Sequence, residues 1–165
     1  MVKNPSLSRR YRLKDSEVRE VLEKAAVTMG NIDLTGFAEG LEIAKIFPQE
    51  EVLLIHGNPV FICMNGEVFP TLLNKEVLGE LPTLTVDMGA VPHLCNGADL
   101  MAPGIVKVAG EFQSGAITMV IDVKFSKPIA LVRTLYSSQE LSEKKQGKVA
   151  RNIHYVGDKF WTLFK

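Results

Sequence analysis

The chain has 165 residues, of which 46% are hydrophobic and 23% are charged, and these values exclude the collagen-like and intrinsically disordered classes. Lys and Arg together number 19, as do Asp and Glu, so a net charge of zero gives no overall attraction to nucleic acid. A chain of this length buries roughly two thirds of its unfolded surface, which indicates one or two domains with real cores.

The N-terminal ten residues lack the apolar stretch that a secretory signal requires. No run of about 18 apolar residues occurs in the chain, so neither a membrane-spanning helix nor a membrane partner is expected. Cys63 and Cys95 lie outside any CxxC pattern, which favours two reduced thiols in the core. The sequence therefore predicts a cytoplasmic protein.

Arg9, Arg10 and Arg12 form a basic cluster that is either a mobile arm or a solvated leader.

The first predicted element is an amphipathic helix that begins near Asp15 and ends before Gly30. Its apolar residues recur at helical spacing, at Val18, Val21, Leu22, Ala25, Ala26 and Met29. The polar face is most simply solvated, with partner binding as the alternative. An irregular or short-helical stretch is expected to follow, through Phe47 and Pro48.

Three apolar runs then predict strands over residues 52–56, 59–64 and 67–73. The pairs Gly57-Asn58 and Asn65-Gly66 separate them, and such pairs supply the positive φ angles of tight hairpins. We therefore expect an antiparallel meander that packs on the first helix. Residues 74–82 are interpreted as a linker, which places a first domain at 1–78.

The second half begins with an alternating strand over residues 83–87, in which Asp87 is suited to cap a short helix that ends at Asn96-Gly97. Ala98 to Met101, a turn at Pro103-Gly104 and a strand over 105–108 come next. The clearest period-two pattern in the chain predicts a long strand from Ile117 to Phe125.

Residues 129–136 are apolar on both faces, which is typical of a central strand. Ser137 and Glu140 are spaced as a capping box for a helix that Gly147 closes, and strands over 149–156 and 160–164 finish the domain. The predicted fold class is α+β, with the N-terminal helix and meander followed by a partly open β-barrel with two short helices at 82–165.

Charge is not spread evenly between the two halves. Residues 1–80 carry 9 Lys and Arg against 12 Asp and Glu, whereas residues 81–165 carry 10 against 7. The second half is therefore the mildly electropositive one, and it is the better candidate for binding an acidic partner.

Residues 86–105, VDMGAVPHLCNGADLMAPGI, resemble the signature of PUA domains, named for pseudouridine synthases and archaeosine transglycosylases. An Asp-ended strand, a GA helix start, a GAD loop and a PGI turn occur in that order, and the ending from Asn152 to Tyr155, with Trp161, also fits. The whole chain further resembles the archaeal and eukaryotic family of the human multiple-copies-in-T-cell-malignancy translation factor, because Asn65-Gly66-Glu67 and Pro70-Thr71-Leu72 match it.

The resemblance implies a pre-PUA domain followed by an RNA-binding PUA domain, in a protein that acts in translation. Its partners would be structured RNA, either tRNA or rRNA, the small ribosomal subunit, and a protein bound through the N-terminal domain. The face formed by the first helix, the glycine loop and the last strand would bind RNA. The candidate residues are Gly97, Ala98, Asp99, Met101, Pro103, Lys144, Lys145, Lys148, Arg151 and His154.

Physical reasoning leaves alternatives open for several of these residues. Gly97 and Ala98 are small enough for a sugar-phosphate backbone to approach, although Gly97 also suits a plain helix cap. For Asp99, a hydrogen bond from a backbone amide is favoured over an RNA contact. The cluster Lys144, Lys145, Lys148 and Arg151 is either a solvated face or a set of phosphate contacts.

No motif for catalysis, a cofactor or a metal is found, and His56, His93 and His154 lack metal-ligand spacing. The prediction is a non-catalytic RNA-binding protein associated with the ribosome or with tRNA. One alternative is an RNA-targeting subunit of a tRNA- or rRNA-modifying enzyme. Another is a small-molecule-binding or hydrolytic barrel, which requires a deep pocket with convergent polar groups.

Overall fold

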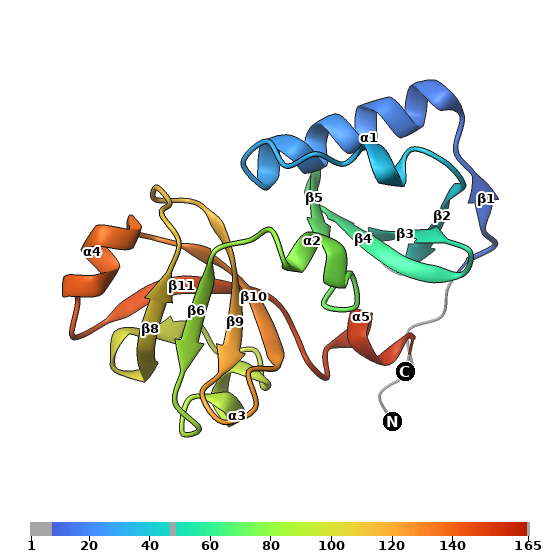
Figure 1. Cartoon of the computed structure of the whole chain (residues 1–165). Helices are drawn as coiled ribbons and strands as arrows, with labels where there is room; N and C mark the ends of the chain where they lie inside the picture. The colour runs from blue at the N-terminus through green and yellow to red at the C-terminus, as the bar shows by residue number, and fades with distance from the viewer. Residues whose placement is uncertain (1–7, 47–48, 165) are drawn as a thin grey trace. The chain divides into compact units, whose positions relative to one another are not determined.

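The computed structural model describes residues 8–46 and 49–164 (Figure 1). The chain divides into two compact units, residues 1–77 with 159–165 and residues 78–158. Phe47 and Pro48, at the end of the predicted irregular stretch, lie outside the described residues. Within those described ranges, no helix is both long and apolar enough to cross a membrane.

The first unit is a five-stranded antiparallel meander in the order β1-β2-β3-β4-β5, with α1 beside β5. Its elements are β1 (Tyr11–Arg12), α1 (Asp15–Thr28), η1 (Thr35–Phe37), β2 (Leu41–Ile46), β3 (Glu50–Ile55), β4 (Asn58–Met64), β5 (Glu67–Pro70), α2 (Lys75–Leu78) and α5 (Lys159–Thr162). Asn65 and Gly66 have φ of 52° and 78°, which confirms the predicted hairpin turn. The preceding turn lies at His56 and Gly57, one residue before its predicted place.

The structure differs from the sequence prediction at three places in this unit, although the division between the two units falls within the predicted linker. Residues 41–46 form β2, an internal strand, in the stretch predicted to be irregular or short-helical. The predicted linker at 74–82 contains α2, and Asn74 is buried because its Nδ2 donates to the carbonyl of Val60. Residues 160–164 do not form a strand; Lys159–Thr162 form α5, whose Phe160 packs on the apolar face of the meander.

The second unit is a six-stranded sheet in the order β7-β11-β10-β9-β6-β8. Its elements are β6 (Thr83–Val86), α3 (Val91–Leu94), β7 (Leu100–Met101), η2 (Ala102–Gly104), β8 (Ile105–Ala109), β9 (Ile117–Asp122), β10 (Pro128–Thr134), α4 (Ser138–Glu143) and β11 (Lys148–Tyr155). The edge strands β7 and β8 are joined by the short η2 turn, which brings the two edges of the sheet together. The result is the predicted partly open barrel, and β10 is the predicted central strand.

Two details of this unit depart from the pattern in the sequence. The strand predicted to run to Phe125 ends at Asp122, because the Asp122 carboxylate accepts the N–H groups of Phe125 and Lys127 and turns the chain. The α4 helix opens on the predicted capping box of Ser137 and Glu140, but it ends at Glu143, before Gly147.

Candidate functional site

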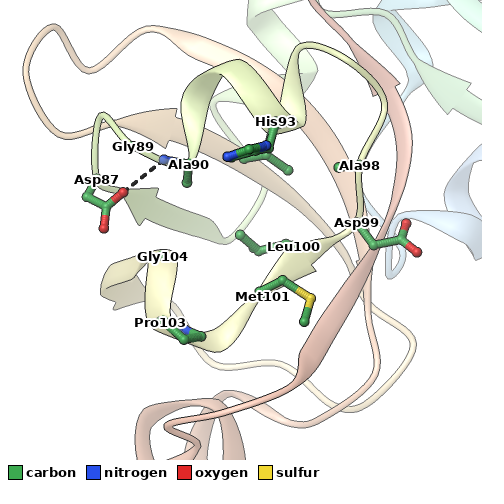
Figure 2. A pocket seen from close by; sticks show the side chains of 11 residues that line it. Asp87, Gly89, Ala90, His93, Ala98, Asp99, Leu100, Met101, Pro103 and Gly104 are labelled. Carbon is green, nitrogen blue, oxygen red and sulfur yellow. Dashed lines mark hydrogen bonds between the residues drawn. The ribbon is translucent and has the colours of Figure 1, made fainter.

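A pocket of about 540 Å³ lies in the second unit, between α3 and the segment that runs from β7 through η2 (Figure 2). Ala90 and His93 come from the α3 side, and Met101 and Pro103 lie opposite them. Most of the lining is apolar or small, with polar groups at Asp87, His93 and Asp99. The pocket lies within the size range of sites for small molecules, about 300–1,000 Å³.

Asp87 and Gly104 fix the position of α3. The Asp87 Oδ1 accepts the N–H of Ala90 at 2.9 Å, as the dashed line in Figure 2 shows, so Asp87 closes the turn that leads into α3, whose N-cap position is Ala90. The Asp87 N–H donates to the carbonyl of Gly104 at 2.9 Å. A Cβ on Gly104 would lie 3.0 Å from the Cβ of Ala90, so a larger residue there would push the helix away from the η2 turn.

The loop after α3 is closed by its own hydrogen bonds. Gly97 has φ of +89°, the predicted left-handed conformation, and its N–H donates to the carbonyl of Leu94 at 3.0 Å. The N–H of Ala98 donates to the carbonyl of His93, also at 3.0 Å. These two amides therefore already have hydrogen-bond acceptors within the loop itself.

Asn152 of β11 holds this loop against the sheet. Its Nδ2 donates to the carbonyls of Leu94 and Ala98, both at 3.0 Å, and its backbone N–H donates to Asp99 Oδ1 at 2.9 Å. Asp99 therefore has the backbone role favoured from the sequence. That N–H donor, with help from Lys148, holds the pKa of the Asp99 carboxyl below its ordinary value.

The four residues of the predicted basic cluster are not equivalent. Lys148 Nζ forms an ion pair with Asp99 Oδ2 at 3.0 Å. In the register of β7 and β11, Lys148 lies opposite Met101, which lines the pocket. Arg151 is exposed on the same strand, and its charge also acts on Asp99. Lys144 Nζ lies over the ring of Tyr136, 4.4 Å from its centre, and Lys145 is exposed after α4. Two of the four cations thus adjoin the pocket.

His154 is the one predicted site residue that is fully enclosed. It is 1% exposed, and its Nδ1 lies 2.6 Å from Asp158 Oδ2, which also accepts the N–H of Tyr155. A buried His–Asp pair of this kind fixes the turn after β11, so direct contact with RNA is not a role for His154 in this structure. Met101 and Pro103 are exposed and line the pocket, as does Ala98.

The sequence reasoning missed several residues that build this site. His93 lines the pocket and is exposed, although its pattern in the sequence favoured an ordinary histidine. Ala90, Leu100 and Gly104 also line the pocket, and Asn152 and Tyr155 support the loop. All of these residues lie within the PUA-like motif and its ending, so their position in that motif could have identified them as site residues.

The electropositive second half is not an electropositive unit. Lys159 and Lys165 belong to the first unit and Glu80 belongs to the second, so residues 78–158 carry eight Lys and Arg and eight Asp and Glu. Any attraction to an acidic partner therefore comes from local placement of cations, as beside the pocket, and not from net charge.

The polar groups near the pocket are engaged in structure. The Asp87 and Asp99 carboxylates accept backbone N–H groups, so they are not arranged as an acid–base pair.

Burial raises the pKa of the Cys63 thiol to about 12, which keeps it protonated at neutral pH, and Cys63 and Cys95 are both free thiols. Among the described residues, no group of three or more His, Cys, Asp or Glu could hold a metal ion.

A second pocket, of about 610 Å³, lies in the first unit between α1 and the η1 segment. Arg19 and Glu23 of α1 and Asp33 near η1 bring charges of both signs to it, and Ala38 is exposed in its lining. It offers no cation cluster like that beside the α3 pocket.

These features define the class of the second unit. Residues 82–156 match the PUA domain family, and residues 9–75 match the family described as a domain of unknown function, DUF1947. The second unit is therefore a PUA domain, an RNA-binding module, preceded by a DUF1947 domain.

The relatives extend this assignment to the whole chain. An uncharacterised protein of Methanocaldococcus jannaschii is 35% identical over 95% of this chain and 98% of its own length. Translation machinery-associated protein 20 of Saccharomyces cerevisiae is 23% identical over 74% of this chain and 72% of its own, and malignant T-cell-amplified sequence 1 of Rattus norvegicus is 28% identical over 74% and 70%. The chain belongs to this family, which joins a DUF1947 domain to a PUA domain and includes proteins of the translation machinery.

Solved structures show the same architecture. A PUA domain protein from Aeropyrum pernix, solved as a tartrate complex, has a TM-score of 0.80 at 26% identity over 96% of this chain and 91% of that one. A conserved PUA domain protein from Thermoplasma acidophilum has a TM-score of 0.73 at 30% identity over 95% and 100%.

Proposed function

We propose that this protein binds structured RNA, either tRNA or rRNA, without catalysing a reaction on it, and that it acts in the cytoplasm as a translation factor associated with the ribosome or with tRNA. The α3 pocket of the PUA domain is the proposed RNA site. A protein partner bound through the N-terminal unit stays a prediction.

The observation that carries the proposal is the combination of an apolar pocket with cations on its rim. Unpaired bases bind in apolar surroundings, while the phosphates beside them need cations. The α3 pocket offers the exposed side chains of Met101 and Pro103 for a base. Arg151 stands on the adjoining strand for the phosphates, and Lys148, about half exposed, would have to share its charge between Asp99 and a phosphate. The translation-associated relatives support a role for this binding in translation.

A charge placed in the pocket tests this site. Ala98 is exposed and lines the α3 pocket, so Ala98→Glu should repel a phosphate and weaken binding of bulk tRNA or small-subunit rRNA. Ala38→Glu is the matched control, because Ala38 is exposed and lines the pocket of the first unit. Equal RNA affinity of the two variants, measured by filter binding, would remove the α3 pocket from the proposal.

Salt dependence tests the cations separately. Arg151→Gln should lower the slope of log affinity against log salt by a little under one, the value for one lost phosphate contact. Arg19→Gln, on an exposed position of α1, should leave the slope unchanged. An unchanged slope for Arg151→Gln, with the variant folded, would place the phosphate contacts elsewhere.

A second candidate is an RNA-targeting subunit of an RNA-modifying enzyme. A probable tRNA pseudouridine synthase B of Pyrobaculum islandicum is 38% identical over 47% of this chain but only 23% of its own length, so the likeness covers about half of this chain and a small part of that enzyme. Co-purification with a catalytic chain would favour this candidate. If the purified protein alone produced a modified nucleoside in tRNA or rRNA, detected by mass spectrometry, the non-catalytic proposal would fail.

A further inference from the structure

The turn between β9 and β10, residues 123–127, presents an exposed aromatic ring with two cations close to it. Phe125 is 59% exposed and Val123 is 46% exposed. Lys124 Nζ lies 5.1 Å from the centre of the Phe125 ring, and Lys127 Nζ lies 5.8 Å from it. An exposed aromatic side chain with two cations beside it is an arrangement that suits a nucleotide, which offers a flat base and a phosphate.

The turn that carries this ring is held in one conformation. The buried Asp122 carboxylate accepts the N–H groups of Phe125 and Lys127, and the Asp122 carbonyl accepts the N–H of Ser126 at 3.1 Å. Ser126 has φ of +54°, which closes the turn tightly. The ring is therefore presented on a fixed support, so a ligand that stacks on it pays little to order the backbone.

The same turn adjoins the α3 pocket. The N–H of Val123 donates to the carbonyl of Val86 at 2.9 Å, and Val86 immediately precedes Asp87, whose carboxylate accepts the N–H of Ala90 at the start of α3. Figure 1 shows the end of β9 and the α3 helix at the same end of the sheet. Met88, between β6 and α3, is 41% exposed. An RNA strand bound at the pocket can therefore continue over this turn.

We propose that Phe125 is a stacking platform for a second unpaired base of the bound RNA, with Lys124 and Lys127 on the phosphates that flank it. This inference rests on the proposed function. Stacking of a base on an aromatic ring is stronger than an exposed cation–π contact, so a base displaces the lysines from the ring. The displaced lysines can then form ionic contacts with the negatively charged phosphates on either side of the base.

The test compares three variants with bulk tRNA and small-subunit rRNA as probes. Phe125→Leu keeps an apolar side chain but removes the ring face, and it should weaken binding about tenfold. Phe125→Tyr keeps the face and should bind like the parent protein. Val106→Thr, at an exposed position of β8, is the control for loss of surface apolarity and should leave affinity unchanged. Melting temperatures verify that all three variants are folded.

The lysines give a second readout. Replacing Lys124 and Lys127 together by Gln should lower the salt slope of RNA binding by nearly two. If Phe125→Leu binds like the parent while Ala98→Glu is weakened, the platform is wrong and the proposed function stands. If Phe125→Tyr is as weak as Phe125→Leu, the ring face is not the contact and the platform is again wrong. If the parent protein binds neither RNA, the proposed function itself fails.

Discussion

Gly97 has a positive φ angle, and the ring of Tyr155 lies close to the position that a Cβ would occupy. A Cβ at this position would lie 3.2 Å from Tyr155 Oη and 3.3 Å from two carbons of its ring. Gly115 has the same φ of +89° with nothing within 4 Å of its Cβ position. Gly97→Ala should therefore unfold more easily than Gly115→Ala in urea, by about 1–3 kcal/mol, the usual cost of overpacking.

Equal losses in the two alanine variants would mean that Tyr155 moves aside freely. The same contact implies that Gly97→Asn also costs stability, although Asn tolerates positive φ, because its Cβ would meet the Tyr155 ring. The sequence predicted the left-handed backbone of Gly97. It could not reveal that the ring of a residue far along the chain occupies the space beside it.

The Asp99 carboxylate should make the stability of the protein depend on pH. Its carboxyl pKa is lowered in the folded protein, first by the N–H of Asn152 and further by Lys148. A lowered folded pKa contributes stability above the ordinary carboxyl pKa, and that contribution is lost as pH falls through the folded value. The difference in unfolding free energy between the parent protein and Asp99→Asn should therefore shrink between neutral pH and about pH 3. A difference that stays constant over this range would show that the Asp99 charge does not stabilise the loop.

The residues that make the family-like ending recognisable serve the structure first. Asn152 binds the loop after α3, Tyr155 lies beside Gly97, and His154 pairs with Asp158. Sequence reasoning placed His154 among the RNA contacts because a motif does not distinguish a residue that touches RNA from one that holds the surface in shape. Burial makes that distinction, and burial depends on the whole sheet.

At the scale of elements, α5 is the clearest test of packing. Phe160 is 6% exposed against a cluster that includes Ile46, Val52 and Ile62 of the meander. Phe160→Ala should cost about 3–5 kcal/mol, the usual loss for a buried aromatic side chain. Hydrogen exchange should then quicken in β2, β3 and β4, while Val27→Ala, at a residue 78% exposed on α1, should leave exchange unchanged. Unaltered exchange in these strands would contradict the docking of α5.

The α5 helix also shows where pattern reading failed. Phe160, Leu163 and Phe164 are spaced to share one face of a helix, and Leu163 and Phe164 pack on the same cluster as Phe160. The prediction of a strand followed from the short apolar run alone. For β9 the alternation continues to Phe125, and only the hydrogen bonds of Asp122 end the strand earlier. Local turns of this kind override a periodic pattern.

At the scale of the whole molecule, each compact unit is electrically neutral. Residues 78–158 have equal numbers of cations and anions, and so do residues 1–77 with 159–165, at eleven of each. RNA affinity in such a protein depends on a few cations at the binding site. We therefore expect the slope of log affinity against log salt to match the small number of phosphate contacts that these cations make. The sequence predicted the fold class correctly, an α+β chain with a partly open barrel in its second half, because strand periodicity and turn residues are local signals.

The most direct measurement is photo-crosslinking of the full chain to RNA that contains 4-thiouridine, with the crosslinked peptides mapped by mass spectrometry. The account predicts crosslinks in residues 87–104, around the α3 pocket, and in residues 148–155 of β11 and its end. Crosslinks confined to residues 8–77 would contradict it, because RNA would then bind the N-terminal unit and the α3 pocket would have another role.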